Sequence, residues 1–129
     1  MGAWGIGPFE NDGAGDLIAD LRSGNFSFDE VGWAFEDEDY LEVDGGQIAL
    51  ALAALAVAIK NSAPSPIEEL DVAAIAPLFT PKSLAFIRAQ GDRTLSDADH
   101  SELYELWEET DDFGAWLAAS RATLAELGR

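Results

Sequence analysis

The sequence predicts an all-α protein: a compact bundle of about five to seven helices around a buried central helix rich in alanine and leucine. Apolar residues recur at helical spacing in most segments, and no segment shows the period-two alternation of a strand. The longest apolar run, Ile48–Ile59, is twelve residues long and too short to suggest a membrane-spanning helix. A chain of 129 residues is expected to form one domain, residues 1–129.

The first two helices are predicted from capping residues and apolar stripes. Asn11 or Asp12 can cap a helix that ends at the Ser-Gly-Asn sequence 23–25, and its apolar stripe comprises Leu17, Ile18 and Leu21. The Ser-Phe-Asp-Glu sequence 27–30 resembles a capping box and predicts a second helix, with an apolar face formed by Phe28, Val31 and Phe35. The acidic residues 36–39 and the following 40–43 are expected to form a loop.

The central helix is predicted to run from a cap at Asp44 to about Asn61. Gln47 stands three residues after Asp44, as a capping box requires. Leucine, isoleucine, valine and alanine then cover every side of the helix. A helix that is apolar all round is buried, so we expect this one to lie at the centre of the fold.

Further helices are expected in the second half of the chain. A connection at 61–66 leads to a short helix at 71–76, which Pro77 ends, and Thr80-Pro81 begins a helix that Gly91 stops. The Ser-Asp-Ala-Asp sequence 96–99 is expected to open the next helix. One face of that helix comprises Leu103, Leu106, Trp107 and Thr110, and the last amphipathic stripe comprises Phe113, Trp116, Leu117, Ser120, Leu124 and Leu127.

The chain is strongly acidic, with a formal net charge of −18. Residues 1–45 carry a net charge of −11, residues 46–92 of −1 and residues 93–129 of −6. Lys and Arg are few and scattered, which argues against direct binding to nucleic acid or to an anionic membrane. The absence of cysteine excludes disulfides, thiolate metal sites and thiol nucleophiles. The charge fits either an acidic binding surface or a solubilising, salt-adapted exterior.

The N-terminus predicts a cytoplasmic protein. It has no basic region and no apolar stretch of signal-peptide length. Ile6 stands where a myristoylation motif would carry Ser or Thr.

The glycine-rich segment 2–13 is the least ordinary part of the sequence. Four glycines and Pro8 need anchors if they are to form an ordered loop, and Trp4 and Phe9 are the natural ones, with Asn11 and Asp12 capping the helix that follows. The segment lacks both glycine-rich phosphate-binding spacings. A hard divalent cation, Ca²⁺ or Mg²⁺, is the alternative ligand, held by Glu10, Asp12, Asp16 and Asp44.

Three other groups of polar residues are not expected to form sites. The acidic run 36–44 departs from the EF-hand pattern, because Leu41 replaces a ligand and Glu42 the turn glycine. A solvated helix face is the interpretation of three glutamates that point away from the apolar stripe, Glu102, Glu105 and Glu109. His100 and Ser101 are adjacent in a helical start, so their side chains diverge rather than form a nucleophile and base.

Three motifs resemble the bacterial domain-of-unknown-function family DUF4259. They are Met1-Gly2-x-Trp4-Gly5-x-Gly7-x-Phe9-Glu10-Asn11-Asp12, Tyr40-Leu41-Glu42-Val43-Asp44-Gly45 before an alanine-leucine helix, and Leu103-Tyr104-Glu105-Leu106-Trp107-Glu108-Glu109. The resemblance implies a small, acidic, stand-alone cytoplasmic protein and assigns no catalytic residue. The residues that match family motif positions are Trp4, Asn11, Asp12, Tyr40, Asp44 and Trp107.

These observations favour a non-enzymatic interaction protein, of inhibitor or immunity type, that binds a basic partner protein. Its candidate binding residues are Trp4, Phe9, Asn11, Asp12, Tyr40 and Asp44. An exposed aromatic patch at Trp4 and Trp33 would favour binding, and burial of both is the alternative. The competing hypothesis is a carboxylate-based divalent-metal protein, with or without hydrolytic activity. A third hypothesis, mimicry of nucleic-acid charge, rests on the same acidic character as the first. The oligomeric state stays open.

Overall fold

The computed structural model describes residues 2–128, and these confirm the all-α fold. They form six α-helices and two short 3₁₀ helices: α1 (Asp12–Ser23), η1 (Glu30–Phe35), α2 (Val43–Lys60), α3 (Val72–Ile75), η2 (Ala76–Leu78), α4 (Pro81–Thr94), α5 (Glu102–Glu108) and α6 (Phe113–Leu127). Within this range, extended pairing is limited to two isolated bridges, Ala3 with Asn11 and Leu41 with Ser101.

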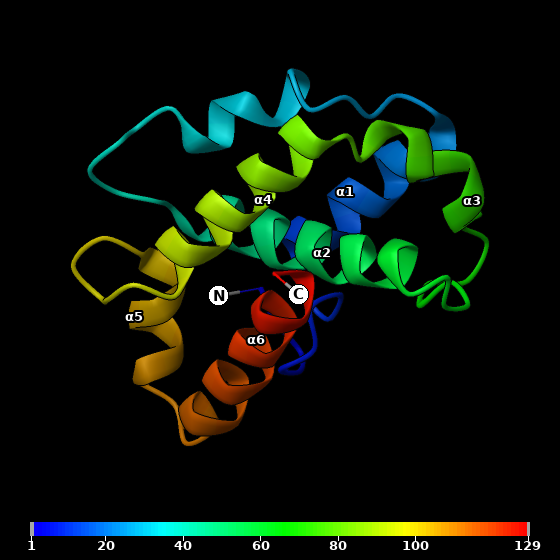
Figure 1. The fold of residues 1–129 in the computed structure, drawn as a ribbon. Coiled ribbons are helices and arrows are strands. Elements are labelled where there is room, and N and C mark those ends of the chain that lie inside the picture. Colours follow the sequence, from blue (N-terminus) through cyan, green and yellow to red (C-terminus); the bar gives the residue numbers. More distant parts are fainter. Residues whose placement is uncertain (1, 129) are drawn as a thin grey trace.

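Helix α2 is the predicted central helix. It crosses the middle of the molecule and packs against α1, α4, α5 and α6 (Figure 1). Its length and mean hydropathy of 1.5 would also suit a membrane span, but 67% of that stretch is buried inside the fold. Its alanines, including Ala51 and Ala53, are almost inaccessible. Such small side chains let neighbouring helices approach α2 closely from several sides.

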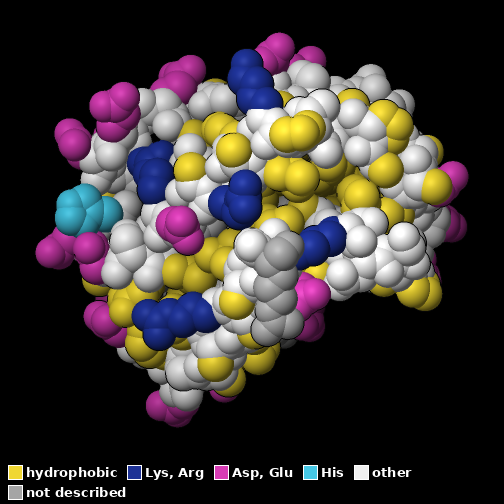
Figure 2. Space-filling model, in the orientation of Figure 1, with side chains coloured by type: hydrophobic (Ala, Val, Ile, Leu, Met, Phe, Trp, Pro, Cys, Tyr) yellow, Lys and Arg dark blue, Asp and Glu magenta, His cyan; other side chains and the backbone are white. Residues whose placement is uncertain are grey.

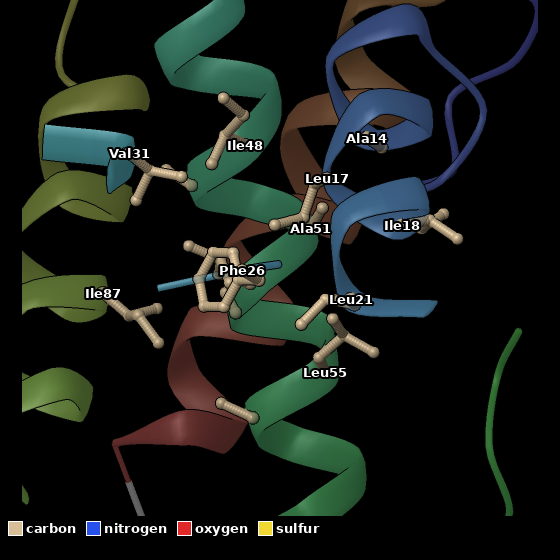
Figure 3. Packing of buried hydrophobic residues seen from close by; sticks show 14 of the residues in the cluster. Ala14, Leu17, Ile18, Leu21, Phe26, Val31, Ile48, Ala51, Leu55 and Ile87 are labelled. Atoms are coloured by element: carbon tan, nitrogen blue, oxygen red, sulfur yellow. The ribbon is translucent and has the colours of Figure 1, made fainter. Parts of the chain in front are cut away.

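The buried side chains form two clusters on different sides of α2. In the larger one, Leu17 and Leu21 of α1 point toward Ala51 and Leu55 of α2, and Ile87 of α4 lies across from them (Figure 3). The smaller cluster joins α2 to α5 and α6, and its buried members are Leu50, Leu95, Leu103, Trp107 and Trp116. The N-terminal residues Ala3 and Ile6 pack against this second cluster.

Several helix boundaries follow the predicted capping residues. Asn11 Oδ1 accepts a hydrogen bond from Ala14 N at 2.8 Å, and Gly24 ends α1 in the left-handed region with φ of +78°. Thr80 caps α4 by accepting from Ser83 N at 3.1 Å. Asp71, expected as the first residue of the short helix 71–76, is instead the cap of α3. The predicted first helix and the last amphipathic stripe therefore coincide with α1 and α6.

The start of the central helix differs from the predicted capping box. The helix begins at Val43, and Asp44 lies exposed in its first turn. Gln47 Oε1 instead accepts from Gly13 N at 3.0 Å, because α1 packs directly against α2. Glu102, predicted to lie on a solvated face, reaches from α5 and accepts from Val43 N at 2.8 Å. The cap of α2 thus comes from a residue 59 positions away.

Three other boundaries are also corrected. Gly91 does not stop its helix, because α4 continues to Thr94 and a Leu124 methyl of α6 occupies the space beside the glycine. The sequence 96–99 forms a turn, and α5 begins later, capped by Ser101. The predicted second helix is the shorter 3₁₀ helix η1, whose first turn Ser27 Oγ supports by accepting from Glu30 N.

Candidate functional site

Two adjacent hollows meet at Trp33 and Asp44. The first has a volume of about 260 Å³ and lies between α1, η1 and the start of α2. The second has a volume of about 220 Å³ and lies between η1, the loop 36–42 and the start of α2. We call their charged lining, together with Trp33, the acidic surface; its carboxylates are Asp16, Asp20, Glu30, Glu36, Asp37, Glu42 and Asp44.

The short helix η1 holds Trp33 in the solvent. Val31 and Phe35 are buried in the larger core cluster, and they anchor the helix from below. Trp33 points the other way, and 59% of its surface is exposed. Gly45 of α2 lies under η1, where an added methyl group would come within 2.7 Å of the Ala34 carbonyl oxygen. Close contact between η1 and α2 therefore fixes the position of this tryptophan.

Local hydrogen bonds shape the loop that follows η1. Asp37 Oδ1 accepts from Asp39 N at 2.9 Å and from Tyr40 N at 3.2 Å. Arg93 of α4 donates to the backbone carbonyls of Asp37 and Phe35. These contacts turn the acidic run back toward α2 and place its side chains around the second hollow.

The next residues are tied to the start of α5. Leu41 N donates to His100 O, and Glu102 N donates to Leu41 O, each at 2.9 Å. Tyr40 precedes this bridge and lines the second hollow. Partial burial first, and then the negative charges of Glu102 and Glu105, raise the pKa of Tyr40. Its phenol is therefore neutral at physiological pH and can donate a hydrogen bond.

The carboxylates of the acidic surface are not neutralised by ion pairs among the described residues, and Arg93, on the backbone of Asp37, is a basic side chain that a hydrogen bond places beside them. Within residues 2–128, none of the seven carboxylates forms an ion pair with Lys or Arg. Figure 2 shows several Lys and Arg side chains spread over the face on which α4 and α6 lie. Helix α4 carries Lys82, Arg88 and Arg93, and α6 carries Arg121. With seven carboxylates and no ion pair to Lys or Arg in the described part of the chain, the acidic surface carries a net negative field.

Some of the N-terminal candidate residues support the fold, and others are exposed to solvent. Phe9 packs partly buried against the larger core cluster, as expected of an anchor. Trp4 does not anchor the loop, because 66% of its surface is exposed. Asn11 is buried as the cap of α1, and Asp12 follows it in the first turn with its side chain exposed. Glu10 Oε1 accepts from Gly7 N at 3.1 Å and closes the loop instead.

The structure separates the carboxylates of the predicted cation site. Asp16 and Asp44 line the first hollow together, whereas Glu10 and Asp12 belong to the N-terminal loop and its junction with α1. Across the described part of the chain, no three Asp, Glu or His side chains come close enough to hold a metal ion.

His100 forms a local pair outside this surface. Its Nδ1 lies 2.7 Å from Asp97 Oδ1, and both side chains are exposed. The hydrogen bond to Asp97 is the main cause of the raised pKa of His100. Ser101 is buried, and its Oγ accepts from Tyr104 N to cap α5. The two side chains therefore act separately, as predicted from their adjacency.

One family comparison extends over nearly the whole chain. The model of the family described as "Domain of unknown function (DUF4259)" matches residues 2–119. The chain belongs to the DUF4259 family. No curated protein sequence and no solved structure gave a significant match. The DUF4259 motifs quoted above include two acidic-surface residues, Glu42 and Asp44, together with Tyr40, which lines the second hollow. Asn11 supports the fold as a helix cap.

Sequence reasoning did not assemble the acidic surface, although it identified parts of it. Asp16, Tyr40 and Asp44 appeared among the candidates, but in different hypothetical sites. Glu30 and Asp20 were not singled out. The helical pattern held one usable signal: Trp33 lies about 200° around the helix from Val31, on the side opposite the apolar face. A large aromatic residue on the polar side of an amphipathic helix points to contact with another molecule.

Proposed function

We propose that this DUF4259 protein is a non-enzymatic interaction module, cytoplasmic and of inhibitor or immunity type, that binds a basic segment of a partner protein. The observation that carries the proposal is an exposed tryptophan set between two hollows that are lined by carboxylates. Trp33 supplies the apolar contact, and the surrounding acids supply charge complementarity. Lys and Arg side chains of the partner fit both features.

Charge supports the choice of a basic partner. Seven carboxylates without an ion-pair partner among the described Lys and Arg side chains raise the local concentration of cations and steer a positively charged protein toward the surface. The same field repels phosphate backbones, so direct binding to nucleic acid is disfavoured. A partner that itself binds nucleic acid would satisfy the same requirement, because its surface is basic.

Trp33 supports a specific contact rather than diffuse attraction. Tryptophan and arginine are enriched among the residues that dominate binding energy at protein interfaces. A guanidinium group stacked over an indole face gains about 0.5–1 kcal/mol at an exposed site and about 2 kcal/mol when desolvated. The two hollows beside Trp33 leave room for the stem of such a side chain and for its neighbours.

The test uses a defined basic probe, a peptide of twelve residues rich in arginine, titrated at several salt concentrations. Trp33→Ala should weaken its binding about tenfold, since it removes the central contact. The triple variant Asp16→Asn, Glu30→Gln, Asp44→Asn should slow association and flatten its dependence on ionic strength.

A charge-matched control separates a site from bulk attraction. Glu108→Gln, Glu109→Gln, Asp111→Asn removes the same number of charges from exposed residues around the end of α5, outside both hollows. It should change peptide affinity less than twofold at physiological salt, where screening acts over about 8 Å. Equal weakening by both triple variants, or association that is insensitive to salt, contradicts the proposal.

A further inference from the structure

A cavity of about 190 Å³ lies against a different face of α2 from the acidic surface. The N-terminal loop covers it, and α2, α5 and α6 form its walls. Its apolar lining includes Ile6, Leu50, Leu103, Trp107 and Trp116. The two indole rings are stacked, with centroids 5.7 Å apart and planes inclined by 14°. This is the smaller core cluster, and the cavity is a gap in its packing.

One polar group in the cavity wall is unused. Ser120 is only 8% exposed, and its hydroxyl makes no hydrogen bond with any residue in the range 2–128. Over the same range, every side-chain nitrogen or oxygen that is sealed from solvent has a partner. The Ser120 hydroxyl must therefore open into the space that it lines. A buried hydroxyl without a partner is energetically unfavourable unless water or a ligand bonds to it.

Several other polar groups around the cavity are already engaged. Asn11 Oδ1 accepts from Ala14 N, and Gln47 Oε1 accepts from Gly13 N. Thr123 Oγ1 donates to Ala119 O at 3.2 Å. Glu10, the charged residue of the lining, has one carboxylate oxygen bonded to Gly7 N. Ser120 thus offers a hydroxyl that can both donate to and accept from a ligand, and the carboxylate of Glu10 disfavours an anion.

We infer that this cavity binds a small neutral aromatic molecule with one hydrogen-bonding group, such as a phenol. The size follows from the volume: a dry apolar cavity of about 150 Å³ accepts benzene, whereas drug-sized ligands need about 300 Å³ or more. The aromatic character follows from the two tryptophans, which offer faces and edges for ring contacts. The single polar group of the ligand pairs with the Ser120 hydroxyl.

The test compares phenol with toluene, which has the same shape and lacks the hydroxyl. Binding is followed by the indole N–H signals of Trp107 and Trp116, with that of Trp33 as the reference outside the cavity. Phenol should shift the Trp107 and Trp116 signals saturably at millimolar or lower concentration, and it should bind more tightly than toluene. Ser120→Ala should weaken phenol about fivefold and leave toluene unchanged.

Ser120→Ala is a safe variant, because the folded state loses no hydrogen bond and alanine is the better helix former. Ser120→Leu fills the cavity and should abolish binding of both probes, with folding verified by the far-ultraviolet circular dichroism spectrum. The inference is overturned if neither probe gives a saturable shift in the unchanged protein. It is overturned equally if Ser120→Ala weakens toluene as much as phenol, or if benzylammonium or benzoate binds more tightly than phenol.

Discussion

The acidic surface and the cavity are both lined by residues of helix α2, but they differ in charge and in the face of the helix that they take. Asp44 and Ile48 of α2 line the first acidic hollow, whereas Gln47 and Leu50 line the cavity. These pairs lie on different faces of α2, because successive residues are rotated by about 100°. One side is charged and built from the first third of the chain. The other is uncharged apart from Glu10 and is covered by the N-terminal loop.

The contrast between the two sites shows that a helix with apolar residues on every side can carry two independent packing layers. Because α2 is buried along most of its length, it supports two separate layers and contributes a few residues to the lining of each site. The larger cluster fixes η1 and hence Trp33, and the smaller cluster leaves the gap beside Ser120. Changes to one layer should therefore spare the other.

The largest expected effect comes from a pair of identical substitutions at two tryptophans. Trp116→Ala removes a side chain that is 3% exposed and should lower the free energy of unfolding by about 3–5 kcal/mol. Trp33→Ala removes a side chain that is 59% exposed and should change the free energy of unfolding by less than about 0.5 kcal/mol. Denaturant unfolding measures both. A comparable loss in the two variants would mean that Trp33 belongs to the core rather than to a binding surface.

A pair of glycine substitutions tests how firmly η1 rests on α2. Gly45→Ala places a methyl group 2.6 Å from a Leu41 carbon and 2.7 Å from the Ala34 carbonyl oxygen. It should lower the free energy of unfolding by about 1–3 kcal/mol and weaken binding of the basic peptide.

Gly15→Ala is the matched control for that substitution. It lies inside α1 with nothing within 4 Å of the added methyl group, and should stabilise the protein by about 0.5–1 kcal/mol. Thermal unfolding distinguishes the two. Stabilisation by both variants would show that η1 yields easily and does not hold Trp33 in place.

His100 offers a smaller effect, outside both regions. The hydrogen bond to Asp97 raises the pKa of His100, so the folded state binds this proton more tightly than the unfolded chain. Protonation therefore stabilises the fold below the ordinary pKa of 6.5, and the contribution disappears as the pH rises through the raised pKa. Asp97→Asn should return the pKa toward 6.5 in an NMR titration of the imidazole. An unchanged pKa would remove Asp97 as the cause.

The smallest expected effect concerns divalent cations. The carboxylates of the acidic surface act through their collective field, and the described residues form no cluster with ligand geometry. At physiological salt, micromolar Ca²⁺, Mg²⁺, Mn²⁺ or Zn²⁺ added after a chelator should leave the melting temperature unchanged. A filled site at about 100 times its Kd would add about 2.7 kcal/mol, so a selective rise of several degrees would favour the metal hypothesis instead.

The sequence predicted a helix correctly where its boundaries and its burial depend on residues close together in the chain. Asn11 caps α1, Thr80 caps α4, and the run Ile48–Ile59 forms the buried centre, because capping and apolar periodicity act within a few residues. The failures arose from distant contacts. Gly91 lies inside α4, beside Leu124 of α6, and no local rule reveals such a partner.

The candidate sites were harder to predict for the same reason. Asp16 and Asp44 were proposed as ligands of one cation, and the structure does place them in one hollow, but with Trp33 and without Glu10 or Asp12. The helical pattern placed Ser120 in the last amphipathic stripe and gave it no role in binding. Its unpartnered hydroxyl became visible only once α6 was packed against α2 and α5. Sequence identifies residue types and local faces, whereas juxtaposition depends on tertiary packing.

The most direct measurement of the central claim is a single set of tryptophan indole spectra, recorded with the arginine-rich peptide and with phenol in turn. The account predicts that the peptide shifts the Trp33 signal and leaves Trp107 and Trp116 in place, while phenol does the reverse. Peptide binding that moves the Trp107 and Trp116 signals but not that of Trp33 would contradict the assignment of the acidic surface. Movement of all three signals by either probe would show that α2 does not separate two sites.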